Sequence, residues 1–360
     1  MEIYFITLVI VYVLNLIKIR KSYYLIISMS LLTVVLGCRD VTVGTDTENY
    51  HIMFYQVSNL PFEFMYLGDL NVEIGFRTLI KILSLIGDSP QLLIFISSAI
   101  MCAFFGLCIY KNIEKRYYYL AILFFVNLGF YFQCLNLIRQ MIAISIGVNS
   151  LQYLKNHKYK KASVIIVCAL LFHQSALLMA LVIPLYYSVD FLVRKKINII
   201  LIVAIYTFAF MCAYYFLDKY VLAFVGEISD KFSVYLYGGL NSETFTFDRH
   251  TLEIIFMLML GTFFINEDNE KTVFCFFSTC FLAGSLIDYI ATKTIFIISR
   301  LALYFQIFNF LSIPFVIPKI KGYYMRNFIL MILLVEIFAS YFNFCIEYSD
   351  KYGVVYKAFF

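Results

Sequence analysis

The chain consists mostly of long apolar runs that are separated by short polar segments. A helix needs about 20 predominantly apolar residues to cross the hydrocarbon core of a bilayer. The runs are continuous and do not alternate every second residue, which excludes an outer-membrane β-barrel. The pattern predicts membrane-spanning helices near residues 3–17, 22–38, 90–110, 117–134, 136–154, 197–217, 251–265, 272–292, 300–317 and 327–346.

One more apolar stretch, 162–193, is interrupted around His173 and again at Pro184. Basic residues in short loops mark the cytoplasmic side of a membrane protein. A single span over this stretch would place one basic cluster outside, whereas a helical hairpin broken near His173 keeps every cluster inside. We therefore predict the hairpin, an outer N-terminus and about ten to twelve transmembrane segments. The basic clusters are Lys18 to Lys21, Lys111 to Arg116, Lys155 to Lys161, Arg194 to Lys196 and Lys319 to Arg326.

Two long polar segments, 39–89 and 218–250, lie on the outer side in this topology. The first begins with a capping-box pattern, in which Thr45 is the N-cap residue and Glu48 follows three residues later. Apolar residues at helical spacing come after it, which predicts a first surface helix. A second surface helix is predicted over about 72–86.

The second surface helix carries Glu73, Arg77 and Lys81 at a spacing of four residues. This spacing places the three charged side chains on one side of a helix. A polar stripe of this kind is typical of a helix that lies in the membrane interface with its apolar side in the headgroup region. We therefore expect this helix to lie along the outer surface of the bilayer.

The composition identifies the class of protein. Of the 360 residues, 62% are hydrophobic and 14% are charged, and the mean hydropathy is +0.85. Soluble domains contain about 25% charged and about 45–50% apolar residues, so a water-soluble fold is excluded. We predict an all-α, polytopic integral membrane protein with a single domain over 1–360 and the lipid bilayer as a partner. The basic loops explain the net charge of +5, so no nucleic-acid partner is expected.

Three arginines stand on the outer side, and an ionisable residue at such a position is a candidate functional residue. Arg139 shares one helical face with small and polar residues, including Gln140 and Ala143. Its guanidinium presents a rigid fork of donors that suits phosphate oxygens. Arg39 and Arg300, at the ends of spans, are further candidates for binding a pyrophosphate. The alternative for each arginine is an interface residue whose side chain snorkels towards water.

His173 is the candidate general base, because a neutral imidazole accepts a hydroxyl proton near neutral pH. The alternative is a packing residue among apolar neighbours. Asp46 is the competing base, and its alternative is a carboxylate favoured by the dipole at the start of a helix. The sequence has no DxD, HExxH, Walker-type loop or GxSxG, so we expect neither a metal nor a cofactor. The supporting polar residues are Gln140, Tyr50, Ser175 and Asp288, which is expected near Arg300.

Five short motifs occur in an order that resembles the EpsG family of polysaccharide polymerases, which are related in role to the O-antigen polymerases called Wzy. Each motif alone is weak, but together they cover most of the chain. One departure is Ile74, where the family pattern has Pro. The motifs are Cys38-Arg39-Asp40 with Gly44 to Tyr50, Glu73-Ile74-Gly75-Phe76, Ile138 to Ala143, Ala169 to Leu177, and Ser299-Arg300-Leu301.

This resemblance implies a GT-C-like glycosyltransferase in the bacterial cytoplasmic membrane, with its active site facing outside. Such an enzyme joins undecaprenyl-pyrophosphate-linked oligosaccharide repeat units and releases undecaprenyl pyrophosphate, with inversion and without a metal. Arg139, Arg300 and Arg39 would neutralise the leaving pyrophosphate, and His173 or Asp46 would take the acceptor proton. A chain-length regulator is a further expected partner.

Two other functions use similar substrates. A flippase for lipid-linked oligosaccharides also has many spans, but it should carry cationic groups deep in a central cavity. An O-antigen ligase uses the same donor chemistry and transfers the glycan to lipid A core. The outer position of the arginines and the order of the motifs favour the polymerase.

Overall fold

The computed structural model describes residues 2–61, 72–216, 249–293, 298–352 and 356–359. Over these ranges the chain is helical, with no strand and one isolated bridge between Arg39 and Ala358. The predicted all-α class is therefore confirmed. The helices are α1 (Glu2–Leu16), α2 (Lys21–Gly37), α3 (Thr47–Ser58), α4 (Ile74–Ser84), α5 (Pro90–Asn112), η2 (Lys115–Tyr117), α6 (Tyr118–Asn127), α7 (Phe130–Asn136), α8 (Ile138–Gly147), η3 (Val148–Ser150), α9 (Leu151–Leu154), α10 (Tyr159–Leu170), η4 (Gln174–Leu181), α11 (Val182–Arg194), α12 (Ile199–Phe216), α15 (Arg249–Phe264), α16 (Asp268–Lys293), α17 (Ser299–Gln306), α18 (Asn309–Val316), η7 (Ile317–Lys319) and α19 (Tyr323–Tyr352).

Several of these helices are long and apolar enough to cross a membrane. Within the described ranges, five meet this condition by length and composition. A sixth is added if the bent pair formed by 115–127 and Phe130–Asn136 is one span, and three more apolar helices are shorter. A polytopic membrane protein is confirmed, and the total of about ten to twelve segments stays a prediction. The five spans are Pro90–Asn112, Gln174–Arg194, Asp268–Ala291, Ser299–Lys319 and Tyr323–Phe342.

The chain divides into two compact units. The first combines Met1–Leu177 with Gly322–Phe360, and the second is Leu178–Lys321. The first unit is therefore discontinuous in sequence, because α19 returns to helices from the N-terminal half. The outer segment predicted over 218–250 falls outside the described residues, except for its last two.

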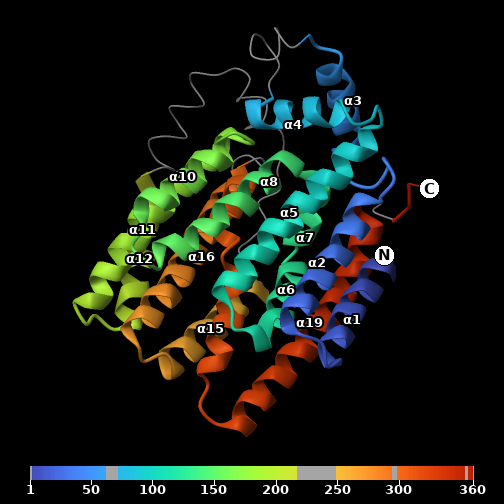
Figure 1. The fold of residues 1–360 in the computed structure, drawn as a ribbon. Helices are drawn as coiled ribbons and strands as arrows, with labels where there is room; N and C mark the ends of the chain where they lie inside the picture. The colour runs from blue at the N-terminus through green and yellow to red at the C-terminus, as the bar shows by residue number, and fades with distance from the viewer. Residues whose placement is uncertain (1, 62–71, 217–248, 294–297, 353–355, 360) are drawn as a thin grey trace. The chain divides into compact units, whose positions relative to one another are not determined.

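In the first unit, helices lie side by side in the order α19, α1, α2, α5, α8 and α10 (Figure 1). The helices α2 and α5 approach closely at Gly37, where an added Cβ would lie 2.6 Å from a ring carbon of Phe95. A residue without a side chain permits this approach between membrane helices. Between α1 and α7, the rings of Tyr4, Tyr131 and Phe132 contact one another edge to face. The many aromatic residues thus fill the core of this unit.

The basic loops of the first unit lie at one end of its helices. Gln91, in the first turn of α5, donates to the carbonyl of Gly37 at the end of α2, so these two helices run antiparallel. Lys155, which follows α9, donates to Asn112 Oδ1 at the end of α5 at 3.3 Å. Arg139, at the start of α8, lies at the opposite end. The basic loops and Arg139 thus lie at opposite ends of the first unit, and the orientation of these ends in the membrane stays a prediction.

In the second unit, α16 is the central helix and contacts α11, α12, α15, α17 and α18. An ion pair of 2.5 Å joins Lys196 to Asp268, and another of 2.5 Å joins Lys319 to Glu270. The acidic first turn of α16 therefore lies beside Lys196 and Lys319, which come from two basic clusters. Pairing explains why acidic residues occur on the expected cytoplasmic side.

The apolar stretch around His173 is broken as predicted. The helix α10 ends at Leu170, and the 3-10 helix η4 begins at Gln174. Pro184 does not interrupt the chain, because it lies in the first turn of α11, where its missing N–H is not needed. The second predicted interruption is therefore wrong. Gln174–Arg194 is also long enough to span a membrane alone, so the second helix is not short, and the hairpin arrangement stays a prediction.

The predicted capping box is wrong. The helix α3 begins at Thr47 with Asp46 as its N-cap residue, and no side chain caps it. The backbone N–H of Thr45 instead donates to Asn136 Oδ1 at 2.8 Å, and the hydroxyl of Thr47 donates to the carbonyl of Val43 at 2.7 Å. Contacts with α7 and with the preceding loop thus replace the local cap.

The predicted polar stripe on the second surface helix is also wrong. Glu73 stands before α4, and Lys81 is buried and donates to the carbonyls of Ser58 and Leu60 at 2.8 and 2.6 Å. The charged side chains therefore reach inwards to loop carbonyls and to the site described below. The exposed side of this segment is apolar instead, and it consists of Ile74, Ile82, Leu85 and Ile86.

Candidate functional site

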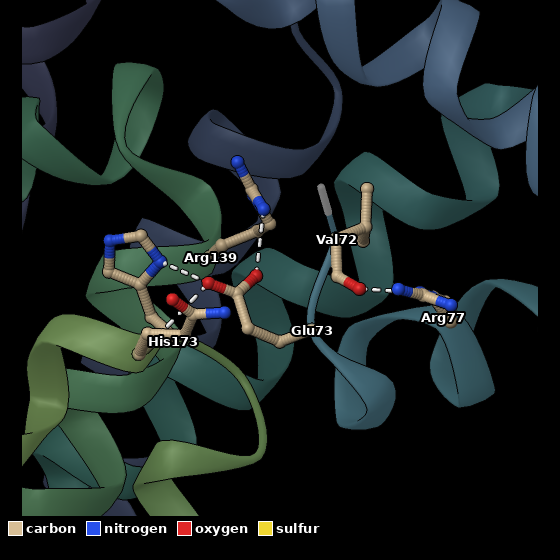
Figure 2. Close-up of polar contacts among 6 residues, drawn as sticks. Val72, Glu73, Arg77, Arg139 and His173 are labelled. Atoms are coloured by element: carbon tan, nitrogen blue, oxygen red, sulfur yellow. Dashed lines mark hydrogen bonds and ion pairs between the residues drawn. The ribbon is translucent and has the colours of Figure 1, made fainter. Parts of the chain in front are cut away.

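Three ionisable side chains from separate segments meet at the end of the first unit that lies opposite the basic loops. Arg139 Nη1 donates to Glu73 Oε2 at 2.7 Å, and His173 Nδ1 lies 2.8 Å from Glu73 Oε1, as Figure 2 shows. Glu73 precedes α4, Arg139 lies in the first turn of α8, and His173 lies in the break after α10. One carboxylate therefore links the predicted base to the predicted phosphate-binding cation.

Backbone contacts bring Glu73 to His173. The N–H of Gly75 donates to the carbonyl of Leu171 at 2.7 Å, and the N–H of Gln174 donates to Glu73 Oε1 at 3.1 Å. A Cβ on Gly75 would lie 2.6 Å from the Leu171 carbonyl oxygen, so a side chain there would push the two segments apart. The start of α4 is therefore fixed against the break after α10.

The Glu73 carboxylate is only 9% exposed, compared with 22% for Arg139 and 26% for His173. Burial alone raises the pKa of Glu73, but hydrogen bonds from His173 and the backbone, together with the charge of Arg139, lower it from 4.5 to about 2. Glu73 is therefore ionised at neutral pH. Because the folded pKa lies below the unfolded one, the resulting stability is fully present above pH 4.5 and is lost as the pH falls through about 2.

The pairing with Glu73 determines which ring nitrogen of His173 is available. An ionised carboxylate only accepts hydrogen bonds, so Nδ1 carries the proton and a neutral ring has its lone pair at Nε2. Figure 2 shows the second ring nitrogen pointing away from Glu73. The imidazole can therefore accept a proton from a group on that side.

Among the residues that the structure describes, no cluster of three or more His, Cys, Asp or Glu is placed to hold a metal ion.

The hydroxyl of Tyr50 belongs to the surroundings of Arg139. Tyr50, on α3, is buried, and its ring contacts that of Phe76 on α4 at 5.9 Å between centroids. Burial raises the pKa of the Tyr50 phenol, whereas the charge and hydrogen bonding of Arg139 act to lower it. Tyr50 thus connects α3 and α4 to the guanidinium, and its supporting role stays a prediction.

The other supporting residues of the first unit lie close in sequence to these groups. Gln140 follows Arg139 and is buried, and Ser175 is half-buried two residues after His173. Asp46 is half-buried at the start of α3, where its charge acts on Tyr50. Asp46 therefore lies near Tyr50, whereas His173 shares the Glu73 carboxylate with Arg139.

Arg39 is placed differently from the prediction. Its side chain is fully buried, and Nη1, Nη2 and Nε donate to the carbonyls of Leu36, Leu135 and Val43 at 2.5, 3.0 and 3.2 Å. Burial lowers the pKa of Arg39 to about 10, so the guanidinium stays charged at neutral pH. A cation is favoured at a helix C-terminus, and the Arg39 guanidinium lies at the C-terminal ends of both α2 and α7. The burial contradicts the predicted pyrophosphate contact and indicates a structural role.

Arg300 and Asp288 belong to the second unit. Arg300 lies in the first turn of α17, and Asp288, on α16, accepts a hydrogen bond from Gln306. The neighbouring helices α16 and α17 therefore share a polar contact near Arg300. The predicted pairing of Asp288 with Arg300 and the role of Arg300 in binding pyrophosphate stay predictions.

Comparison with protein families identifies the chain. The EpsG family model matches residues 22–358, which is nearly the whole sequence. The chain belongs to the EpsG family. EpsG is a family of Wzy-like polymerases, so the predicted resemblance is confirmed and the function is that of a polysaccharide polymerase in general terms. No curated protein and no solved structure matches the chain significantly.

In this EpsG chain, Glu73 is the site residue that sequence reasoning missed. The spacing of Glu73, Arg77 and Lys81 suggested an outward stripe, although Glu73 precedes the helix and points to His173. The available signal was the motif Glu73-Ile74-Gly75-Phe76, which the resemblance had already singled out. A charged residue two positions before a glycine that permits close backbone approach is the feature that the spacing argument overlooked.

The contact at Gly75 gives a test of how the EpsG site is held. Gly75→Ala should lower the free energy of unfolding by about 1–3 kcal/mol, because the added methyl group meets backbone atoms that move only with the whole segment. We expect faster hydrogen exchange of the Gly75 amide and a lower yield of polymer. Denaturant unfolding of the purified protein and exchange mass spectrometry measure these effects.

Gly87→Ala is the matched control, since a Cβ there would meet only the Leu92 side chain at 3.9 Å. It should leave unfolding, exchange and polymer yield near the wild-type values. If the two alanine variants behave alike, the close approach of Gly75 to Leu171 does not hold the site together.

Proposed function

We propose that this protein polymerises undecaprenyl-pyrophosphate-linked oligosaccharide repeat units at the outer face of the bacterial cytoplasmic membrane. The growing chain on its lipid pyrophosphate is the donor, and a single lipid-linked repeat unit is the acceptor. Membership of the EpsG family supports the class of reaction, and the apolar helices support a substrate carried in the bilayer. A regulator of chain length is a proposed partner.

In the proposed step, an acceptor hydroxyl oxygen attacks the anomeric carbon of the donor sugar. The new glycosidic bond forms as the bond to the pyrophosphate oxygen breaks, and undecaprenyl pyrophosphate leaves with the electron pair. His173 Nε2 takes the hydroxyl proton. A single displacement from the opposite side inverts the configuration at the anomeric carbon.

Arg139 is the proposed partner of the leaving group. Fixed cations neutralise charge that develops in a transition state, so a pyrophosphate can depart without a metal. The Arg139 side chain is 22% exposed, so part of it is accessible from outside the protein. Arg300, in the second unit, stays a candidate pyrophosphate-binding residue on the sequence alone.

The observation that carries this proposal is the pair of bonds from Glu73 to His173 and Arg139, at 2.8 and 2.7 Å. A general base and a phosphate-binding cation are needed on the two sides of a reacting anomeric carbon, and here they are held by one buried carboxylate. A lone snorkelling arginine or a packed histidine would not require this arrangement.

A complementation experiment tests the proposal. In cells that lack the chromosomal gene, the wild-type chain should restore long glycan, whereas Arg139→Ala should leave glycan of a single repeat unit. Loss of the guanidinium removes charge compensation at the leaving pyrophosphate without preventing synthesis of the repeat. Arg20→Ala is the matched control, because Arg20 is exposed at the opposite end of the first unit and should be dispensable for polymerisation.

The glycan pattern, separated by length on a gel, distinguishes the outcomes. Long chains that persist with Arg139→Ala would exclude Arg139 from the site. Repeat units that accumulate inside the cells without the gene would indicate a flippase. Polymer that stays on undecaprenyl pyrophosphate and is not transferred would indicate a ligase.

A further inference from the structure

The Glu73 carboxylate is placed between two groups that the proposed reaction uses, but it touches neither sugar nor phosphate in that proposal. Oε1 accepts from His173 and from the Gln174 backbone, and Oε2 accepts from Arg139. Both oxygens are therefore occupied by hydrogen-bond donors. With the side chain 9% exposed, the carboxylate is also largely shielded from water.

We propose that Glu73 is a positioning residue, which fixes the tautomer and orientation of His173 while it holds the Arg139 guanidinium at the same site. This inference rests on the proposed function. A carboxylate on Nδ1 keeps that nitrogen protonated and leaves Nε2 as the proton acceptor. When the ring becomes an imidazolium, the same carboxylate stabilises the positive charge.

A purely structural role for Glu73 has a different signature. The backbone bond from Gly75 to Leu171 joins the same two segments without any side chain. The fold therefore has a second connection at this place, and a variant that changes only the carboxylate can keep it. If Glu73 merely connects the segments, its loss should weaken folding and substrate binding but should not change the proton chemistry of His173.

Glu73→Gln separates these two roles because an amide has one oxygen and one NH₂ group. If the NH₂ faces Arg139, two donors oppose each other and the guanidinium loses its partner. If the NH₂ faces His173, Nδ1 must become an acceptor, so the proton moves to Nε2 and that nitrogen can no longer act as a base. In both arrangements the negative charge that stabilises an imidazolium is absent.

Steady-state kinetics of the purified protein with lipid-linked repeat units provide the first test. Glu73→Gln should lower kcat by about 10²- to 10⁴-fold, since loss of the carboxylate that orients a general-base histidine lowers kcat by up to about 10⁴-fold. KM should stay within about threefold, because Arg139 is proposed to compensate charge that develops on the leaving pyrophosphate only in the transition state, so its displacement also lowers kcat. The acid limb of the kcat profile should move to lower pH, since the protonated ring loses its counter-charge. Glu73→Asp, which keeps the charge, should recover part of kcat, and Glu48→Gln, at an exposed carboxyl on α3, should behave like the wild type.

A nuclear magnetic resonance measurement tests the tautomer without relying on turnover. The chain contains four histidines, so a protein labelled with ¹⁵N in its imidazole rings gives few signals, and His173→Gln assigns the relevant pair. In the wild type, the neutral ring of His173 should carry its proton on Nδ1. In Glu73→Gln, the population with the proton on Nε2 should increase.

Each outcome decides between the interpretations. A lower kcat with an unchanged pH profile and an unchanged tautomer would overturn the positioning role and leave a structural one. Turnover of Glu73→Gln equal to that of the wild type would overturn it as well. If the wild-type protein itself forms no polymer from the repeat units, the proposed function fails and this inference fails with it. If the wild type and Glu48→Gln both form polymer and Glu73→Gln does not, the defect belongs to the variant alone.

Discussion

His173→Ala should lower turnover of lipid-linked repeat units by about 10²–10⁴-fold, the usual contribution of a positioned general base. The ring that accepts the hydroxyl proton is lost, whereas Arg139 and Glu73 keep their ion pair. Substrate binding should therefore change little, and the loss should appear in kcat. Added imidazole should restore part of the activity, because the space left by the side chain can admit a free base. Purified protein and a polymer-length assay provide the measurement.

Two control variants make this result specific. His157→Asn changes an exposed histidine in the basic loops, where the backbone has a φ of 53° that asparagine tolerates, and it should leave turnover unchanged. Asp46→Asn should have a small effect on turnover, because it leaves the contacts of Glu73 with His173 and Arg139 unchanged. Near-normal turnover by His173→Ala, together with a large loss in Asp46→Asn, would transfer the role of the base to Asp46.

Arg39→Met should lower the free energy of unfolding by about 3 kcal/mol, because three buried carbonyls lose a donor at a cost of about 1–3 kcal/mol each, and removal of a buried charge offsets part of this loss. The carbonyls of Leu36, Leu135 and Val43 would lose a donor that water cannot easily replace. Met keeps the length and much of the volume of the side chain, so the loss reports on hydrogen bonds more than on packing. Unfolding of the detergent-solubilised protein measures this effect.

The role predicted from sequence gives the opposite expectation for Arg39. A residue that binds pyrophosphate would, when replaced, raise KM for the lipid-linked donor and leave unfolding unchanged. Arg20→Met is the control for the substitution itself, since Arg20 is exposed. A wild-type unfolding free energy for Arg39→Met, combined with a raised KM, would restore the original interpretation.

Hydropathy predicted most of the fold because the bilayer imposes long apolar helices whatever their packing. The span predicted over 90–110 is α5, and that over 272–292 is α16, each with small differences at the ends. Helix interruptions were harder to predict. Pro184 is tolerated in the first turn of α11, whereas Gly129, with a φ of 80°, separates α6 from α7 at a bend of 52°. Both outcomes depend on where the residue falls within a turn, which the apolar pattern does not determine.

The candidate site was predicted in part. His173 and Arg139 were selected from sequence because ionisable residues are rare in apolar surroundings, and the structure brings both to Glu73. Glu73 and Arg39 were assigned wrongly, since spacing along the chain does not show whether a charged side chain points to water or to a buried partner. The carbonyls that hold Arg39 come from positions up to 96 residues away, so only the tertiary structure identifies them.

The isolated bridge between Arg39 and Ala358 has a consequence for the order in which the protein is made. Backbone bonds join Cys38 to Phe359 and Asp40 to Lys357, so the loop after α2 obtains these partners only from the far end of the chain. At about 5–20 residues per second, a ribosome needs tens of seconds to pass from one to the other. During that time α2 and α5 can already pair in the membrane, while the loop that leads to α3 and Tyr50 still lacks its backbone partners from the C-terminal segment. Closure of the first unit is therefore a late event in biosynthesis.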